Sequence, residues 1–545
     1  MIFFSVPRTS PIYSQYSPMN EKPGGGFQRA STDASGFAGA QPRLAKTAQY
    51  IAVFRLAAVA PYLLTLAKHE AAVVCWNPPP LLISLNLCYT APMVRKNIIQ
   101  VRKSLFLLVS LCLFLACSGR EGESKSKQTA ESSTPSQEEI QLSLQQQQEL
   151  QRQQAQQAAI QKFIQSLDPV QRYSQLFLVN LEGNKEFYPV ESLQWGELPE
   201  QELVPGGYLF FSYNIADSPQ EVAAFTASIQ GWCQQRGILP PLFTLDQEGG
   251  LVNRLRGVTS SLPSAQTVAA TMTASQARQL YALQAAQMKL LGFHLNLAPV
   301  AEASGQYNQE FLDTRSFGNA STTENYAIAA IAGFQQEELG AVVKHFPGNT
   351  NADPHSGLPE IALSQQELQE LYLEPFRKII AAGNPWALLM SHARTTAHDS
   401  ETPACLSRFW VTEVLRQDFG YEGLILSDDI FMAALEKNGF PPEKAAIMAM
   451  EAGIDVIMLS EKKFGSVLRL FLEKSQKEPD FKSLLDAAVE RVIKIKVEAG
   501  LLCFQEAEGG LSLVCSDSAV NQWNEAEFQN LFQQGQELCS AALGE

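Results

Sequence analysis

Eight short apolar segments recur along the chain and are separated by longer amphipathic stretches. They cover residues 175–179, 206–211, 241–246, 295–299, 341–346, 387–392, 424–429 and 455–460. Apolar runs of this length are typical of strands buried on both faces of a parallel sheet, with the intervening helices covering those faces. Eight such units predict an α/β fold of the (β/α)8 TIM-barrel type. An open doubly wound sheet is the alternative, but no G-x-G-x-x-G follows the first run.

The amphipathic stretches carry signals that start and stop helices. Ser364 and Glu367 have the spacing of a capping box, and the helix that they open is expected to end near Gly383. The segment "PPEKAAIMAMEAG" begins with proline and ends at Gly453, which is the usual asymmetry of helix ends. A last helical pattern is expected to close the barrel near Leu502.

The chain ahead of the barrel has the features of an export signal. Residues 93–117 contain a methionine, four basic residues, a short apolar run and finally Cys117. A basic region followed by a short apolar core describes a secretory signal, and the run is too short for a comfortable membrane span. "LFLAC" resembles a bacterial lipobox, so we expect Cys117 to be lipidated and to anchor the protein in the bacterial cell envelope, on its periplasmic or outer surface. A plain cleaved signal or an N-terminal membrane anchor is the alternative.

The remaining extensions are predicted from their composition. Because a signal peptide belongs at an N-terminus, we expect translation to start at Met93 and residues 1–92 to be untranslated upstream sequence or disordered. Residues 118–166 read as a disordered tether followed by a Gln-rich solvated helix or low-complexity linker. Residues 167–502 form the expected catalytic barrel, and residues 503–545 a tail with a small helical cap.

Charge and cysteine spacing restrict the partners. The formal net charge of -15 argues against nucleic acid, because a phosphate-binding surface needs a basic patch. The cysteines after Cys117 are scattered and lack C-x-x-C spacing, which argues against zinc. A disulfide is a candidate only within one group: Cys503, Cys515 and Cys539.

Charged and polar residues gather where the predicted strands end. They are Asp246, Lys344 with His345, Ser391 with His392, and Asp428 with Asp429. In a (β/α)8 barrel all C-terminal strand ends open at one mouth, where active sites are built. Each residue alone has a structural interpretation, such as a helix cap or a satisfied core histidine. Their recurrence at several strand ends predicts an active site.

The segment "KHFPGNTNADPHSGLP", residues 344–359, adds a second group of polar residues. Pro354 stiffens the link between Asp353 and His355, and a carboxylate beside an imidazole can orient it and stabilise its charged form. Two chemistries fit this mouth. One is a metal site, for which the ligand types are present in His345, His355, His392 and Asp428. The other, which the loop composition favours, is glycoside hydrolysis by a carboxylate nucleophile and a proton donor on the loop.

Four motifs together resemble glycoside hydrolase family 3, and specifically its β-N-acetylglucosaminidase branch. They are "DQEGGLVNR", "LAPVAE", "KHFPG....DPH" and "GLILSDDIFM", and the resemblance covers residues 167–502. It implies a (β/α)8 barrel that takes no cofactor or metal and hydrolyses with retention through a glycosyl-enzyme. The chain departs from the family pattern at Glu302, where the family has Asp, at Asn349 and Thr350, where it has His and Gly, and at Pro354, where it has Ser or Thr. The stretch before Asp353 is also two residues shorter than in the family.

Matched position by position, the resemblance assigns roles to individual residues. Asp428 corresponds to the nucleophile, His355 to the general acid/base, and Asp353 to its partner. The residues that correspond to ligands of the nonreducing GlcNAc are Asp246, Arg254, Arg315, Lys344 and His345. Such side chains suit sugars because they make charge-assisted hydrogen bonds to vicinal hydroxyls. Asp429 is expected to cap a helix or to support the site.

These observations lead to one principal hypothesis and two alternatives. We expect a monomeric, lipid-anchored exo-β-N-acetylglucosaminidase that removes terminal GlcNAc from peptidoglycan fragments or chito-oligosaccharides. The first alternative is a non-catalytic lipoprotein that binds cell-wall fragments through GlcNAc. The second is a metal-dependent barrel hydrolase.

Overall fold

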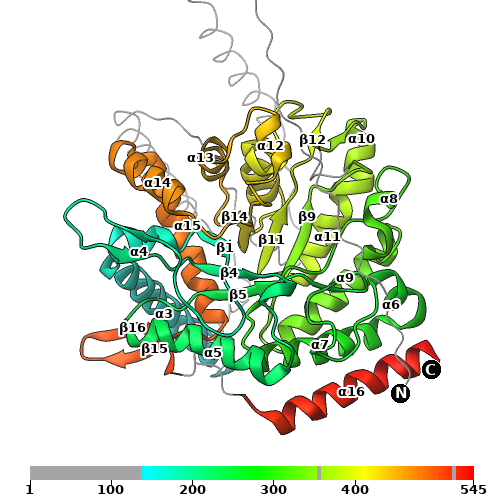
Figure 1. Ribbon diagram of the computed structural model, residues 1–545, viewed down its shortest axis with the longest axis horizontal. Coiled ribbons are helices and arrows are strands. Elements are labelled where there is room, and N and C mark those ends of the chain that lie inside the picture. The colour runs from blue at the N-terminus through cyan, green and yellow to red at the C-terminus, as the bar shows by residue number, and fades with distance from the viewer. Residues whose placement is uncertain (1–136, 353–356, 518–522, 545) are drawn as a thin grey trace, which may run out of the picture. The chain divides into compact units, whose positions relative to one another are not determined.

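The computed structural model describes residues 137–352, 357–517 and 523–544. The predicted export segment with Cys117, the proposed start at Met93, and both Asp353 and His355 lie outside these residues. Within the described part, the strands occupy the centre and the helices surround them (Figure 1).

Eight parallel strands form the central sheet. They are β1 (Phe177–Asn180), β4 (Gly207–Phe210), β5 (Leu242–Leu245), β8 (Leu295–Asn296), β9 (Gly340–Phe346), β11 (Ala387–Met390), β13 (Leu424–Leu426) and β14 (Ile457–Leu459). Each strand pairs in parallel with the next one along the chain from β1 to β13, and β14 pairs in parallel with β1. Each of the eight predicted apolar runs overlaps one of these strands, and six contain theirs entirely.

The barrel closes between β13 and β14. A parallel bridge joins Leu426 to Val456, and the backbone N–H groups of Asp455 and Ser427 donate to Ile425 and Val456. The predicted (β/α)8 barrel is therefore confirmed, and the open doubly wound sheet is wrong. The strands read as uninterrupted apolar runs because every barrel strand is covered by side chains on both faces.

Helices follow the strands in the order that the sequence predicts. The principal ones are α4 (Pro169–Ser174), α5 (Pro219–Gln235), α6 (Ala265–Thr271), α7 (Ala274–Leu290), α9 (Ala320–Gln336), α11 (Glu374–Gly383), the π-type helix η5 (Phe409–Asp418), α12 (Ala433–Lys437), α13 (Pro442–Ala452), α14 (Gly465–Lys477) and α15 (Pro479–Glu498). Ser364 and Glu367 form the expected capping box at α10 (Gln365–Leu368). Gly453 ends α13 at a φ of 107°, a backbone conformation that favours glycine.

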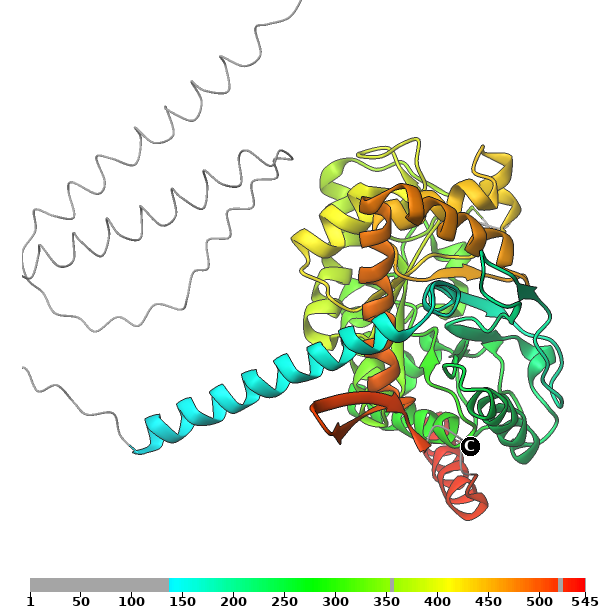
Figure 2. The same cartoon turned by 90° about the vertical axis from the view of Figure 1, so that its left-hand side faces the viewer.

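The Gln-rich segment forms one continuous helix, α3 (Gln137–Ser166). The described side chains of its first half are exposed, whereas Ile160 and Ile164 near its end are buried. Gln157 and Gln161 each donate to the Glu490 carboxylate of α15, at 2.8 and 2.6 Å. The end of α3 therefore packs against α15, as Figure 2 shows, and the buried apolar residues of α3 are concentrated at that end.

The segment after the barrel is more structured than the sequence predicted. β15 (Leu502–Ala507) and β16 (Gly510–Cys515) form an antiparallel hairpin that contacts α3, and α16 (Glu525–Leu543) packs on α7. Cys503 and Cys515 are both free, so no pair within the candidate group of three forms a disulfide and that prediction is wrong. Cys503 lies opposite Val514 and Cys515 opposite Leu502, which places the two thiols on opposite faces of the hairpin. Among the described helices, none combines the length and apolarity needed to span a bilayer.

Candidate active site

A cleft of about 430 Å³ opens at the C-terminal ends of the barrel strands. Its lining residues belong to β4, β9, β11 and β14 or to the segments that follow β4, β5, β8, β9, β13 and β14. Six residues that the sequence singled out line it together: Asp246, Arg254, Arg315, Lys344, His345 and Asp428. They meet because parallel strands bring their carboxyl ends to one rim.

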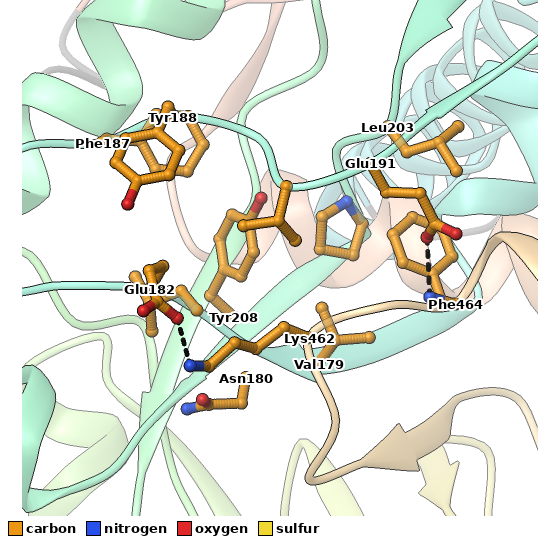
Figure 3. Close-up of a pocket in the computed structure, with 13 residues that line it drawn as sticks. Val179, Asn180, Glu182, Phe187, Tyr188, Glu191, Leu203, Tyr208, Lys462 and Phe464 are labelled. Atoms are coloured by element: carbon orange, nitrogen blue, oxygen red, sulfur yellow. Dashed lines mark hydrogen bonds and ion pairs between the residues drawn. The ribbon is translucent and has the colours of Figure 1, made fainter.

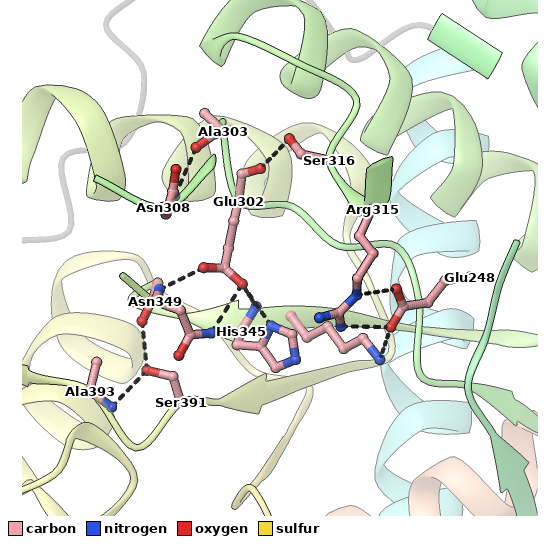
Figure 4. A network of polar contacts seen from close by, with 12 residues as sticks. Glu248, Glu302, Ala303, Asn308, Arg315, Ser316, His345, Asn349, Ser391 and Ala393 are labelled. Carbon is pink, nitrogen blue, oxygen red and sulfur yellow. Dashed lines mark hydrogen bonds and ion pairs between the residues drawn. The ribbon is translucent and has the colours of Figure 1, made fainter. Parts of the chain in front are cut away.

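Five charged side chains form a chain of alternating sign along this cleft. Lys344 is central, and its Nζ lies 2.6 Å from Asp246 Oδ1 and 2.6 Å from Glu248 Oε1. Arg315 holds Glu248 from the other side with two hydrogen bonds, of 2.8 Å from Nε and 3.0 Å from Nη2 (Figure 4). Arg254 Nη2 lies 3.5 Å from Asp246 Oδ2 at the more exposed end. The order is therefore Arg254, Asp246, Lys344, Glu248, Arg315, with one net positive charge.

Burial and neighbouring charges fix the ionisation of Glu248, Lys344 and Arg315. Burial alone would raise the pKa of Glu248, but the Lys344 ammonium and the Arg315 guanidinium lower it to about 2. Burial likewise opposes the charge on Lys344, yet Asp246 and Glu248 raise its pKa above the ordinary value. The pKa of Arg315 is also raised, because the hydrogen bonds and charge of Glu248 outweigh its desolvation. These groups keep their charges at neutral pH, so they present fixed donors and acceptors.

Aromatic rings flank the two arginines. The Arg254 guanidinium carbon lies 5.7 Å from the centre of the Phe211 ring, and that of Arg315 lies 5.6 Å from Phe311. Both rings line the cleft. Arg254 Nε is buried and has no hydrogen-bond partner among the described residues, so this guanidinium retains a donor that its protein neighbours do not satisfy. Polar donors between apolar faces are the usual makeup of a small-molecule site.

A second polar network supports the floor of the cleft and is centred on Glu302. The Glu302 carboxylate lies 2.6 Å from His345 Nδ1 and accepts hydrogen bonds from the Asn349 N–H at 2.6 Å and from Asn349 Nδ2 at 3.2 Å (Figure 4). Glu302 and Asn349 are two of the positions at which the sequence departs from the family pattern. In the structure they contact each other, and together they fix the orientation of His345.

Asp428 and Asp429 follow β13 and line the cleft side by side. Among the described residues, the only hydrogen bond to the Asp428 carboxylate comes from the Asp429 N–H to Oδ1, at 2.8 Å. Asp429 Oδ1 instead accepts from the N–H groups of Phe431 and Ser460, at 3.0 and 3.1 Å. Asp429 therefore joins the segments after β13 and β14, in agreement with its expected supporting role.

Glu248 is the main cleft residue that the sequence reasoning did not assign. It stands two residues after Asp246, and side chains at that spacing point to the same side of an extended segment. This spacing could have indicated it. The pairing of Glu302 with Asn349 gave no comparable signal, because the two residues are far apart in the sequence.

Of the four residues proposed as metal ligands, His355 lies outside the described residues, and the other three do not form a metal site together. His345 contacts Glu302, whereas the two imidazole nitrogens of His392 contact Cys405 Sγ and the Asp429 carbonyl. Within the described ranges, no three His, Cys, Asp or Glu side chains are arranged to hold a metal ion.

A smaller hollow lies beside the end of β1 (Figure 3). Its charged residues are paired within the protein: Lys462 with Glu182, and Glu191 with the N–H groups of Phe464 and Gly465 at the start of α14, at 3.0 and 2.9 Å. These pairs are structural, because they fix the segment after β14 against the segment after β1.

The protein has a parallel (β/α)8 barrel with a charged cleft, flanked by aromatic rings, at its C-terminal rim. These features are those of barrel enzymes that bind small polar substrates. Within this class, residues 198–495 match the model of the glycosyl hydrolase family 3 N terminal domain. This match covers more than half of the chain, and the chain therefore belongs to glycoside hydrolase family 3, as its motifs predicted.

Individual relatives agree with this assignment. A β-hexosaminidase from Pasteurella multocida (strain Pm70) is 31% identical over 319 residues, which are 56% of this chain and 88% of that protein. β-Hexosaminidase A from Pseudoalteromonas piscicida is 28% identical over 275 residues, and the match spans 47% of this chain and 45% of that protein. The chain thus spans less than half of the second relative.

A solved structure shares the fold. It is the glycoside hydrolase family 3 β-N-acetylglucosaminidase from Paenibacillus sp. str. FPU-7, with 26% identity and a TM-score of 0.58. The superposition covers 68% of this chain and 69% of that chain.

Proposed function

We propose that the chain is a retaining exo-β-N-acetylglucosaminidase that removes terminal GlcNAc from oligosaccharides. The observation that carries this proposal is the placement of the Asp428 carboxylate in the same cleft as the charge chain from Arg254 to Arg315. The relatives named β-hexosaminidase and β-N-acetylglucosaminidase support the choice of sugar.

The charge chain has the chemistry needed to hold a pyranose ring. Asp246 and Glu248 are hydrogen-bond acceptors, whereas Lys344, Arg254 and Arg315 are donors. A sugar hydroxyl can therefore donate its proton to a carboxylate while its oxygen accepts a hydrogen bond from a neighbouring cation. Since these charges are fixed by their neighbours, binding the sugar requires little reorganisation of the site.

Asp428 is the proposed nucleophile. Its Oδ1 accepts the Asp429 N–H, so Oδ2 is available to attack the anomeric carbon and form the glycosyl-enzyme. His355, paired with Asp353, is proposed to protonate the leaving oxygen and then to activate the water that releases the sugar. This second assignment rests on the resemblance of "DPH" to the family motif.

The cellular setting belongs to the same proposal. A lipidated Cys117 would place the enzyme at the cell envelope, and peptidoglycan fragments are the GlcNAc-containing substrates available there. The Gln-rich helix α3 lies between that anchor and the barrel in the sequence.

The nucleophile assignment is tested by Asp428→Ala on p-nitrophenyl β-N-acetylglucosaminide. Release of p-nitrophenol should fall below detection, because no glycosyl-enzyme can form. Asp418→Ala is the matched control, since Asp418 is an exposed aspartate on η5. Undiminished turnover by Asp428→Ala would overturn the assignment, and GlcNAc binding without turnover by the wild type would favour the non-catalytic alternative.

A further inference from the structure

Two buried side chains behind the cleft wall contact each other and the segment of the proposed nucleophile. His392, the second residue after β11, and Cys405, in the short helix η4 (Ala404–Leu406), are both fully buried. His392 Nδ1 lies 3.1 Å from Cys405 Sγ, and His392 Nε2 lies 3.0 Å from the Asp429 carbonyl oxygen. Neither residue lines the cleft.

The partners of His392 determine its tautomer. A carbonyl oxygen only accepts hydrogen bonds, so His392 Nε2 must carry the proton and donate it to Asp429. In a neutral imidazole Nδ1 is then an acceptor, and the Cys405 S–H must donate to it. Burial, with a smaller contribution from the negative charge of Asp428, raises the pKa of the Cys405 thiol well above its usual value, so the thiol keeps the proton that it donates.

These hydrogen bonds complete the fixation of Asp429. Its carboxylate accepts from Phe431 and Ser460, and its carbonyl accepts from His392 and from the Met432 N–H at 3.1 Å. Its own N–H donates to Asp428 Oδ1. The peptide that orients the proposed nucleophile is thus held through a histidine whose tautomer the Asp429 carbonyl selects and whose Nδ1 the Cys405 thiol satisfies.

We propose that Cys405 and His392 are positioning residues for Asp428, acting through the hydrogen bonds from the thiol to the imidazole and from the imidazole to the Asp429 carbonyl. The catalytic part of this inference rests on the proposed function. The hydrogen-bond part does not, and it can be measured without turnover.

Without the thiol, the buried His392 Nδ1 loses its hydrogen-bond donor, so one of the two contacts that fix the rotation of the imidazole against the Asp429 carbonyl is missing. Cys405→Ala should therefore lower kcat by about tenfold, as expected for one lost hydrogen bond. His392→Phe removes both bonds and should lower kcat by about 100-fold, the effect of a small misplacement of a reacting group. KM should change little, because the charge chain that would bind the sugar lies on other strands.

Two further variants separate positioning from general damage to the core. Cys405→Ser keeps a hydroxyl donor and should recover most of the kcat lost in Cys405→Ala. Cys233→Ala is the matched control, because Cys233 is also a fully buried cysteine but lies on α5, away from the cleft. It should keep wild-type kcat.

The deciding measurement is nitrogen NMR of ¹⁵N-histidine-labelled protein, with the His392 signals assigned from their absence in His392→Phe. The wild type should show the Nε2–H tautomer at His392, and Cys405→Ala should keep it but shift the Nδ1 resonance, because Nδ1 no longer accepts a hydrogen bond. An unchanged Nδ1 resonance in Cys405→Ala, or a kcat equal to that of Cys233→Ala, would overturn the proposal. If the wild type hydrolyses no β-GlcNAc glycoside, the proposed function fails and the catalytic role with it, whereas the NMR result still decides whether the hydrogen-bond chain exists.

Discussion

The barrel buries two clusters of charge at opposite ends of its strands, and they differ in what satisfies them. At the N-terminal end, Asp455 lies just before β14 and contacts Arg416 at 2.5 Å and Arg491 at 2.8 Å. Its carboxylate also accepts the Ile425 N–H at 2.8 Å. At the C-terminal end, the chain from Arg254 to Arg315 lines an open cleft.

The difference indicates two uses of the same kind of interaction. Every partner of Asp455 is a protein group, and the Ile425 contact joins β13 to β14 where the barrel closes. This cluster therefore stabilises the fold. In the charge chain at the C-terminal end, the buried Nε of Arg254 has no hydrogen-bond partner among the described residues. All five members of that chain line the open cleft. Charge that the protein leaves partly unsatisfied is suited to binding a ligand.

The largest expected effect on stability is at Asp455, where β13 and β14 close the barrel. Asp455→Ala removes the counter-charge of the largely buried Arg416 and of the partly exposed Arg491, and it leaves the buried Ile425 N–H without its acceptor, so the free energy of unfolding should fall by about 3–5 kcal/mol. Urea denaturation of the full chain measures this. Glu374→Ala, which breaks the half-exposed pair with Arg377, should cost less than about 1 kcal/mol. A loss at Asp455 no larger than at Glu374 would remove the distinction between the clusters.

The second prediction concerns Glu248, at the buried end of the charge chain in the cleft, and the pH dependence of the stability that it provides. The pKa of Glu248 is lowered from 4.5 to about 2 in the folded protein, so between these pH values the unfolded state binds more protons. The stability from Glu248 is complete above about pH 4.5 and is lost as the pH falls toward 2. Glu248→Gln should thus be less stable than the wild type by roughly 3 kcal/mol at pH 7, and the difference should shrink at pH 3. A pH-independent difference would contradict this origin.

The third prediction concerns Arg254, at the more exposed end of the charge chain. Here we expect the smallest effect on stability but a large effect on activity. Arg254→Ala breaks a 3.5 Å contact to Asp246 and should cost less than about 1 kcal/mol of stability. It should nevertheless lower kcat/KM by about 100-fold, if the guanidinium binds the sugar. Arg256→Ala is the matched control, because Arg256 is exposed on the same loop and does not line the cleft. Equal activity of the two variants would show that Arg254 is a structural residue.

Much of this architecture was predictable from local patterns. The eight strands, the capping box at Ser364 and the glycine end at Gly453 follow from hydrophobic periodicity and backbone preferences, which act over a few residues. The grouping of Asp246, Lys344 and Asp428 also followed, because parallel strands bring their carboxyl ends together whatever the details of the loops. The hairpin after Leu502 was missed, since its strands are partly exposed and lack the apolar runs of the barrel.

The sequence by itself determined the order of strands and helices, and with it the rim on which the charged residues stand. Only the tertiary structure decided which of them touch: Glu248 between Lys344 and Arg315, Glu302 with Asn349, and Cys405 with His392. The physical reason is range. Strand periodicity and helix capping depend on neighbouring residues, whereas a hydrogen bond needs atoms from distant segments within about 3 Å, and the packing of the whole barrel sets that distance.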